Sequence, residues 1–226
     1  MNRAQVLIYA KPPRIGLSKT RLAETLGSAV KARRIASAIQ AKTVRAALQG
    51  AWKTILYTTP DKMLRGTASD LWPGHLERRS QGSGTLTQRL NKGLREALCG
   101  PVLFIGSDAP DISPALIRRA VRDLGRHDAV FGPARDGGFW LFGIHKTART
   151  RTPFENVRWS GPHAMEDVWA NLPVSASVAV LPQLIDIDDA KDWAVWRGQH
   201  DEETQPHPVS AEPQKKGILA RLLGTG

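Results

Sequence analysis

Short apolar segments alternate with stretches of helical periodicity along most of this chain, and this alternation constrains the fold more than any other feature. Apolar runs bounded by Gly, Pro or Asp predict strands over residues 6–10, 52–59, 75–79, 101–106, 129–132, 139–144 and 174–181. Apolar residues at helical spacing predict helices from about 19, over 28–48 and 85–98, after Pro114, and over 162–171 and 190–199. Strands that alternate with helices form βαβ units, so we expect an α/β fold with helices on both faces of a mostly parallel, mixed sheet.

The length and composition fit one such domain. The chain has 226 residues, and its 41% hydrophobic content can fill a sizeable core. We expect the domain to span residues 1–198, because the acidic residues and prolines that follow mark a flexible tail over 199–226. A short amphipathic stretch, residues 218–223, is typical of a frayed tail or an oligomer contact, so a homo-oligomer stays open. It is too short for stable membrane insertion.

Two features indicate a cytoplasmic protein. The only cysteine, Cys99, has no partner for an intramolecular disulfide, which favours a reducing compartment. We expect this cysteine to be half-buried at a helix end. The apolar run over residues 6–10 is too short for the core of a signal peptide or for a membrane span.

Positive charge is concentrated in the first 50 residues. The net charge is +11, and residues 1–50 hold ten Lys or Arg residues against one acid, Glu24. Such a balance is typical of three kinds of partner: nucleic acid, an anionic membrane surface, or a phosphate-bearing ligand. Because the aromatic residues are not interleaved with the basic ones as a base-stacking surface requires, we expect no nucleic acid. The pattern favours a small phosphorylated ligand near residues 11–21.

The loop after the first predicted strand has the residues of an anion site. Gly16 permits a tight turn, Lys19 and Arg21 supply positive charge, and the start of a helix adds backbone N–H groups. We expect Ser18 to cap this helix. A nucleotide-binding P-loop is excluded, because that motif requires glycine where this chain has Ser18 and Pro13.

Acidic residues mark two further loops. Asp108 comes directly after a buried strand, where a carboxylate can hold Mg²⁺ or Mn²⁺ against phosphate oxygens. Asp188 lies in an Asp-rich segment before the last helix and can complete that metal site. Each has an alternative role as a helix cap. Asp111 is the better capping candidate beside Ser113, and Asp188 or Asp189 can cap the last helix.

Two glycine-containing loops are weaker signals. Asp136-Gly137-Gly138 separates two predicted strands. It is typical either of a plain hairpin turn or of a functional loop at the same sheet edge as Asp108. Gln81-Gly82-Ser83-Gly84 leads into a helix that carries Arg89, and alone it indicates little.

Taken in order, these segments resemble the bacterial glycosyltransferase-A-like transferases known as arsenosugar-biosynthesis glycosyltransferases, or radical-SAM/selenodomain-associated transferase 1. The resemblance covers about residues 4–198 and rests on five segments: Lys11-Pro12…Gly16…Lys19-Thr20-Arg21-Leu22, Gln81-Gly82-x-Gly84…Arg89, Gly106-Ser107-Asp108-x-Pro110, Gly132-Pro133-Ala134-x-Asp136-Gly137-Gly138-Phe139 and Asp186-x-Asp188. The family is similar in fold to 2-phospholactate guanylyltransferase and to the molybdenum-cofactor guanylyltransferase. The resemblance implies a nucleotide-diphospho-sugar transferase fold, a Rossmann-like three-layer sandwich, with the nucleotide over the first strand and its loop.

The resemblance also implies roles for individual residues. Nucleotide contacts are expected from three loops, through Ala10, Lys11, Pro12, Gly16, Lys19, Arg21, Gln81, Gly82, Gly84, Arg89 and Ser107. Acceptor contacts are expected from Gly137, Gly138, Trp140 and Trp159. Asp108 stands in the metal-ligand position, with Asp188 as the second ligand. The chain departs from its relatives at Thr85-Leu86-Thr87, where an acid and a glycine are common, and at Phe139-Trp140, where the usual pair includes tyrosine.

The leading hypothesis is metal-dependent transfer from an activated nucleotide, most simply glycosyl transfer from a nucleotide sugar to a small-molecule acceptor. Mg²⁺ or Mn²⁺ on Asp108 would neutralise the diphosphate as it leaves, with Lys19 and Arg21 assisting. Asp136 is the candidate general base. Two alternatives stay open: nucleotidyl transfer from a nucleoside triphosphate to a small phosphorylated acid, and a non-catalytic nucleotide-binding module.

Overall fold

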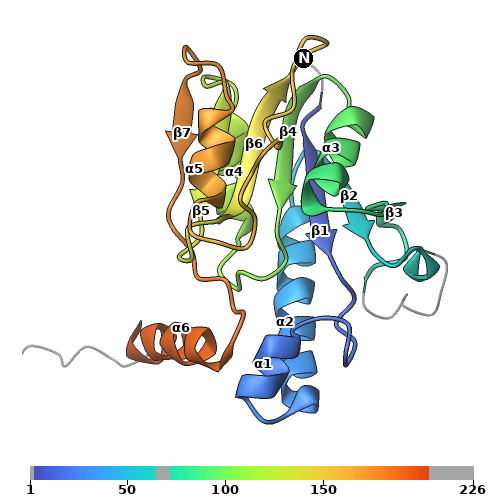
Figure 1. The fold of residues 1–226 in the computed structure, drawn as a ribbon, viewed down its shortest axis with the longest axis vertical. Helices are drawn as coiled ribbons and strands as arrows, with labels where there is room; N and C mark the ends of the chain where they lie inside the picture. The colour runs from blue at the N-terminus through green and yellow to red at the C-terminus, as the bar shows by residue number, and fades with distance from the viewer. Residues whose placement is uncertain (1–2, 65–71, 204–226) are drawn as a thin grey trace, which may run out of the picture.

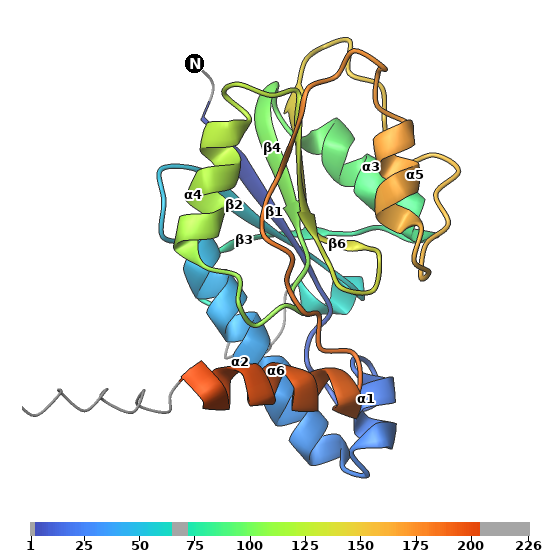
Figure 2. The ribbon, with the colours of Figure 1, turned by 90° about the vertical axis from the view of Figure 1, so that its left-hand side faces the viewer.

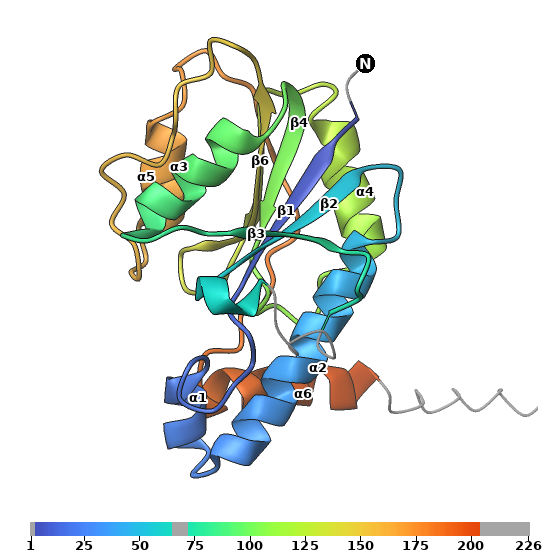
Figure 3. The same cartoon turned by 90° about the vertical axis from the view of Figure 1, so that its right-hand side faces the viewer.

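Seven strands form one sheet in the part of the chain that the structure describes. The structure is a computed structural model that describes residues 3–64 and 72–203. The strands are β1 Gln5–Ala10, β2 Lys53–Thr58, β3 Glu77–Ser80, β4 Gly100–Ile105, β5 Ala129–Pro133, β6 Phe139–Lys146 and β7 Val178–Val180. They lie in the order β3-β2-β1-β4-β6-β5-β7 (Figure 1). Figure 3 shows the sheet from the side of β3 and β2. Only β6 runs antiparallel to its neighbours, so the predicted mostly parallel, mixed sheet is confirmed.

Several of the described helices begin where a polar side chain accepts a hydrogen bond from a free backbone N–H group. The helices are α1 Thr20–Thr25, α2 Ala29–Ala47, η1 Asp61–Met63, α3 Leu86–Glu96, α4 Pro114–Asp123, α5 Ala164–Ala170 and α6 Ala190–Glu203. Ser28 caps α2, Thr85 caps α3 in a capping box with Gln88, and Ser113 caps α4. None of these helices combines the length and apolarity that crossing a membrane requires.

Two capping expectations differ from the structure, and a third is resolved between its two candidates. Helix α1 begins after Lys19, which has left-handed backbone angles, and the Ser18 hydroxyl is buried without capping it. Asp111 does not cap α4, because its carboxylate accepts a hydrogen bond from the indole of Trp196. Of the two candidates before α6, Asp189 accepts from backbone N–H groups in the first turn.

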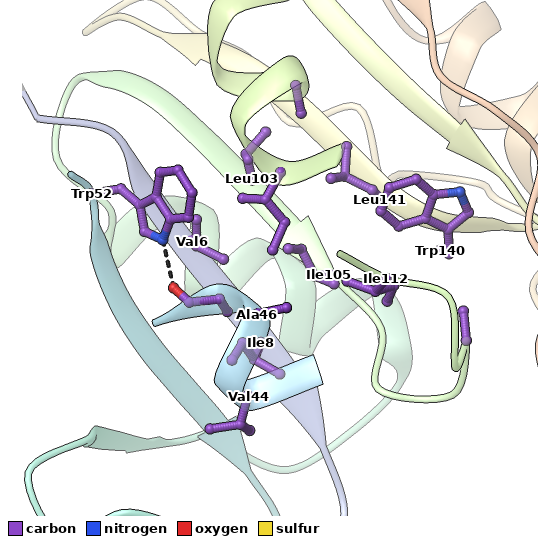
Figure 4. Packing of buried hydrophobic residues seen from close by; sticks show 14 of the residues in the cluster. Val6, Ile8, Val44, Ala46, Trp52, Leu103, Ile105, Ile112, Trp140 and Leu141 are labelled. Atoms are coloured by element: carbon purple, nitrogen blue, oxygen red, sulfur yellow. Dashed lines mark hydrogen bonds between the residues drawn. The ribbon is translucent and has the colours of Figure 1, made fainter. Parts of the chain in front are cut away.

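Helices cover both faces of the sheet, which gives three layers. Helices α2 and α4 pack on one face, and α3 and α5 pack on the other (Figure 2). The alternation of strand residues divides the core accordingly: Val6 and Ile8 of β1 face α2 and α4, whereas Leu7 faces α3. Figure 4 shows the α2 side of this core, where the indole N–H of Trp52 donates to the carbonyl of Ala47.

A third, smaller apolar cluster lies below the carboxyl edge of the sheet. Helix α1, the first half of α2 and α6 meet there around Leu22, Ile35 and Ile187 (Figures 1 and 2). Helix α6 continues to Glu203, past the predicted domain end at residue 198. The rest of the predicted tail, with its stretch 218–223, lies outside the described residues. Cys99 is exposed rather than half-buried.

A β-bulge between β5 and β6 determines where the aromatic pair after Gly138 points. Gly132 pairs with Leu141 and Pro133 pairs with Phe139, so Trp140 is the extra residue on β6. Trp140 and Leu141 therefore both lie on the α2 and α4 side, where Figure 4 shows them in the core. Trp140 is 1% exposed, so it is corrected from an acceptor-binding residue to a core residue.

Candidate functional site

The loops that follow β1, β4 and β5 meet at the carboxyl edge of the sheet and border two adjoining cavities. The polar cavity, of about 560 Å³, lies over the end of β1 and contains Lys11, Lys19, Arg21 and Arg89 in its wall. The apolar cavity, of about 210 Å³, lies over the end of β4 and beside the hairpin loop 134–138. Tyr9 and Leu86 line both cavities, so the two are neighbours. This is the sheet edge at which α/β folds of this kind bind ligands.

Lys19 forms the centre of the polar cavity's charged end. Its ammonium lies 3.1 Å from a carboxylate oxygen of Asp108 and 2.7 Å from one of Asp188. The Lys19 side chain is 9% exposed, whereas both carboxylates are almost half exposed. Burial alone would lower the pKa of Lys19, but the charges of Asp108 and Asp188 outweigh it and raise the pKa. Three segments that lie far apart in the sequence therefore meet at one permanently charged amine.

The backbone around Lys19 is held in an uncommon conformation. Lys19 has φ 52° and Gly16 has φ 78°, both in the left-handed region, which only glycine adopts at little cost. The side-chain amide of Gln40 in α2 donates to the carbonyl of Lys11 over 2.6 Å and fixes the start of the loop. The backbone N–H of Ile187 donates to the carbonyl of Asp108 over 3.0 Å and holds the Asp188 segment beside the β4 loop.

Asp186 also belongs to the site, although its position in the sequence predicted no role for it. It lines the apolar cavity, and its Oδ1 is buried and has no hydrogen-bond partner among the described residues. Burial, with the negative charges of Asp108 and Asp136, raises the pKa of Asp186 to about 8. In the sequence, only the Asp186-x-Asp188 pattern points to this residue. The pattern does not show which of the two carboxylates is buried away from water.

The Gln81 loop closes the polar cavity on the side of α3. Gln81 is buried, and its amide donates to the carbonyls of Tyr57 and Ala10 over 3.0 and 3.4 Å. Its oxygen accepts from Arg89 over 3.4 Å, so Gln81 orients that guanidinium. Gly84 has φ 90°, and a Cβ there would lie 1.8 Å from the side-chain oxygen of Gln88 in the capping box. Glycine at 84 is therefore required by the helix start.

The loop 134–138 is a hairpin turn and also borders the apolar cavity. The Asp136 carboxylate accepts from the backbone N–H of Gly138 over 2.9 Å, a local turn contact. Gly137 has φ 87°, and a Cβ there would lie 2.2 Å from the carbonyl oxygen of Pro162. Asp136 and Gly138 line the cavity, and Gly137 sets the path of the loop. The loop 134–138 is therefore both a hairpin turn and part of the cavity wall, so the two interpretations of this motif do not exclude each other.

The structure brings together most of the expected site residues, but not all. Ala10, Lys11, Lys19, Arg21, Gln81, Arg89 and Ser107 line the polar cavity with Asp108 and Asp188. Gly138 and Trp159 line the apolar cavity. Six expected residues line neither cavity: Pro12, Gly16, Gly82, Gly84, Gly137 and Trp140. The first five lie in the bordering loops, and Trp140 lies in the core. Among the described residues, no group of three or more His, Cys, Asp or Glu is arranged as a metal site. The Lys19 ammonium contacts both Asp108 and Asp188.

Comparison with known proteins gives a family and a fold. A family model described as "Uncharacterized protein conserved in bacteria (DUF2064)" matches residues 42–161. No curated protein matches the chain in sequence. A protein from Desulfovibrio desulfuricans that is proposed to be a nucleotide-diphospho-sugar transferase has a similar structure, with 26% identity, 90% of each chain covered and a TM-score of 0.76.

Two more distant structures share the fold. A nucleotidyl transfer enzyme of Methanothermobacter is 17% identical over 90% of this chain and 100% of its own, with a TM-score of 0.57. The 4-diphosphocytidyl-2C-methyl-D-erythritol synthase of Anaerococcus prevotii is 12% identical over 88% of this chain and 98% of its own, with a TM-score of 0.56. The predicted nucleotide-diphospho-sugar transferase fold is thereby confirmed.

Proposed function

We propose that this chain, which belongs to the bacterial family DUF2064, is a transferase that uses an activated nucleotide, with a nucleotide sugar as its donor. One observation carries the proposal: a buried lysine, paired with two carboxylates from distant loops, at the end of a cavity that holds three further basic side chains. The similarity to a proposed nucleotide-diphospho-sugar transferase supports the same donor class. The finer resemblance to arsenosugar-biosynthesis glycosyltransferases stays a prediction, because the family description names no reaction.

The polar cavity suits a nucleoside diphosphate group. Lys11, Lys19, Arg21 and Arg89 would bind its phosphates, since Lys and Arg are the usual phosphate partners in proteins. The nucleoside would lie over Ala10 at the end of β1, beside Gln81 and Ser107. Lys19 is the basic residue that the structure orients most tightly, because two carboxylates hold its ammonium.

The carboxylates fit a divalent metal. Asp108 and Asp188 offer hard oxygen ligands of the kind that Mg²⁺ and Mn²⁺ prefer, and the buried Oδ1 of Asp186 lacks a partner that a cation can supply. We propose Asp108 and Asp188 as metal ligands, in place of their contacts with the Lys19 ammonium. When bound, the metal supplies Lewis-acid stabilisation of the charge on the departing diphosphate.

Side chains of the protein would stabilise the leaving group and accept the proton of the acceptor. Lys19 and Arg21 would stabilise the negative charge of the leaving group, which is the contribution that preorganised cations make in a partly buried site. Asp136 borders the apolar cavity and is placed to accept the proton of an acceptor hydroxyl. Tyr9 lies between the two cavities, and burial raises its pKa, so it does not act as a base; its hydroxyl donates to the carbonyl of Arg89.

A binding experiment tests the proposal. The full chain is titrated by calorimetry with a panel of nucleotide sugars and nucleoside triphosphates, with and without Mn²⁺, beside Lys19→Met and Asp108→Asn. We expect metal-dependent binding of a nucleotide sugar that both variants lose. Lys31→Met, an exposed residue of α2, is the matched control and should bind as wild type does. Metal-dependent binding that survives in both site variants would contradict the assignment.

The reaction products distinguish the proposal from its alternatives. Glycosyl transfer releases a nucleoside diphosphate or monophosphate, whereas nucleotidyl transfer to a phosphorylated acid releases pyrophosphate. Two nucleotide-transferring enzymes share the fold, but similarity below 25% identity shows the fold alone. Binding without turnover of any donor would favour a non-catalytic nucleotide-binding module.

A further inference from the structure

We infer that the second substrate enters the apolar cavity and is a small hydroxyl compound with an apolar body and no phosphate or carboxylate on the part that enters. The inference rests on the proposed function, because it assigns the neighbouring polar cavity to the donor nucleotide. It concerns the acceptor, for which neither the family nor the similar structures supply a class. Three features of the cavity carry it: its aromatic walls, the sign of its charges and its position.

Aromatic rings form much of the cavity wall. Tyr9, Phe139 and Trp159 line it, with Leu90 and Phe104 beside them. The polar atoms of two of these rings already have partners in the protein. The Tyr9 hydroxyl donates to the carbonyl of Arg89 over 3.2 Å, and the Trp159 indole donates to the hydroxyl of Thr87 over 2.8 Å. These residues therefore offer the cavity mainly ring carbon, which favours an apolar ligand body.

The cavity is lined by two carboxyl groups and by no basic side chain of the described residues. The two carboxyl groups are those of Asp136 and Asp186. An anion taken from water into such a site loses hydration, finds no basic side chain and meets the negative charge of Asp136. A hydroxyl group has the opposite preference, because it can donate to a carboxylate. The lining therefore selects against phosphorylated acids and in favour of alcohols or phenols.

Basic residues outside the apolar cavity do not make it favourable for an anionic acceptor. Lys11, Lys19, Arg21 and Arg89 line the polar cavity, which the donor phosphates fill in our proposal. Arg135 lies in a third cleft, beyond Asp136 and Asp186, where five carboxylates outnumber three basic side chains. An acceptor phosphate would therefore compete with the donor for its partners. The charge distribution disfavours nucleotidyl transfer to a phosphorylated acid.

The position of the cavity suits an acceptor. It shares Tyr9 and Leu86 with the polar cavity, so a ligand in one cavity lies against a ligand in the other. Asp136 and Asp186 border it on the side of the hairpin and of the Asp188 segment. In glycosyl transfer the acceptor oxygen would form the new bond to the sugar carbon and give its proton to Asp136, and the nucleoside diphosphate would leave with the bonding electrons.

The experiment uses a matched pair of probes, benzyl alcohol and benzyl phosphate. Binding to the full chain is measured by ligand-detected saturation-transfer NMR for wild type, Trp159→Leu and Trp169→Leu, with Mg²⁺ and a saturating nucleoside diphosphate present so that the phosphate-binding polar cavity is occupied. Trp169 is the control, because it is 40% exposed and stacks on Phe131 away from the cavity. We expect wild type to bind benzyl alcohol at least about tenfold more tightly than benzyl phosphate, from like-charge repulsion alone. Trp159→Leu should weaken the alcohol, and Trp169→Leu should not.

A charge variant gives an independent readout. Asp136→Asn keeps an oxygen that can accept from the Gly138 N–H but removes one negative charge, so benzyl phosphate should gain affinity relative to benzyl alcohol. The inference is overturned if wild type binds benzyl phosphate as tightly as the alcohol, or if no binding depends on Trp159. Nucleotide binding is measured on the same samples. If wild type binds no nucleotide but still prefers benzyl alcohol to benzyl phosphate, the proposed function is refuted. If wild type binds nucleotide but prefers benzyl phosphate, only the proposed acceptor class is refuted.

Discussion

Replacing Lys19 with Met tests whether the ion pairs at the site are energetically real. The variant keeps the length and most of the apolar stem of the side chain but removes the charge that lies 3.1 Å from Asp108 and 2.7 Å from Asp188. Breaking a fully buried ion pair costs about 3–5 kcal/mol. Here the carboxylates are 43% and 48% exposed, so solvent screening reduces the expected loss of unfolding free energy to about 1–2 kcal/mol.

Urea unfolding followed by tryptophan fluorescence measures this loss, in EDTA to exclude bound divalent ions. Double-mutant cycles with Asp108→Asn and Asp188→Asn then isolate each pair. We expect a coupling energy for both, because one ammonium serves two carboxylates. Mg²⁺ should stabilise the Lys19 variant more than wild type, since the carboxylates then have no other cation.

One result would show that the Lys19 ion pairs do not stabilise the fold. If Lys19→Met unfolds at the same urea concentration as the Lys31→Met control, and both coupling energies lie below about 0.3 kcal/mol, the pairs contribute nothing measurable. Lys19 would then be a surface lysine that happens to lie near two acids. Its conformation at φ 52° would have no energetic explanation.

Two further predictions concern the supports of the apolar cavity. Gly132→Ala places a Cβ 2.3 Å from the indole of Trp140, so overpacking should lower the unfolding free energy by about 1–3 kcal/mol in urea; an unchanged value would contradict the account of the bulge. Hydrogen bonds from the side chain and backbone of Arg158 lower the pKa of Asp167 to about 2, from an ordinary value of 3.8. The stabilisation from this lowered pKa is fully present above pH 3.8 and disappears as the pH falls through about 2. The thermal unfolding temperature of Asp167→Asn should therefore change less between pH 4 and pH 2 than that of wild type. Identical slopes would show that the pair does not stabilise the loop before α5.

The fold was predictable because local signals and topology agree. Each buried strand is bounded by turn residues, and Ser28, Thr85 and Ser113 begin their helices as capping rules expect. Parallel strands place all their carboxyl ends at one edge, so residues that follow different strands had to lie close together. That constraint is why Lys19, Asp108 and Asp188 could be grouped without knowing the coordinates.

What the sequence did not reveal depends on single long-range contacts. Asp111 accepts from Trp196, which lies 85 positions later, and no local rule distinguishes that partner from a capping role. Trp140 is turned into the core by one extra residue in a β-ladder, which reverses the alternation on which side-chain direction is usually read. The buried oxygen of Asp186 likewise depends on how three loops pack, not on its neighbours in the sequence.

The single antiparallel strand explains how the two cavities come to differ in charge. Because β6 runs against β4 and β5, its first residue lies at the carboxyl edge, and the hairpin brings Asp136 and Phe139 to the cavity over β4. The basic residues of the polar cavity come from the other half of the sheet, in the loop after β1 and in α3. In our proposal, the topology of the sheet therefore separates the donor side of the site from the acceptor side. A charge change in the loop 134–138 should accordingly alter acceptor preference while it leaves nucleotide affinity intact, which is the separation that the Asp136→Asn measurement detects.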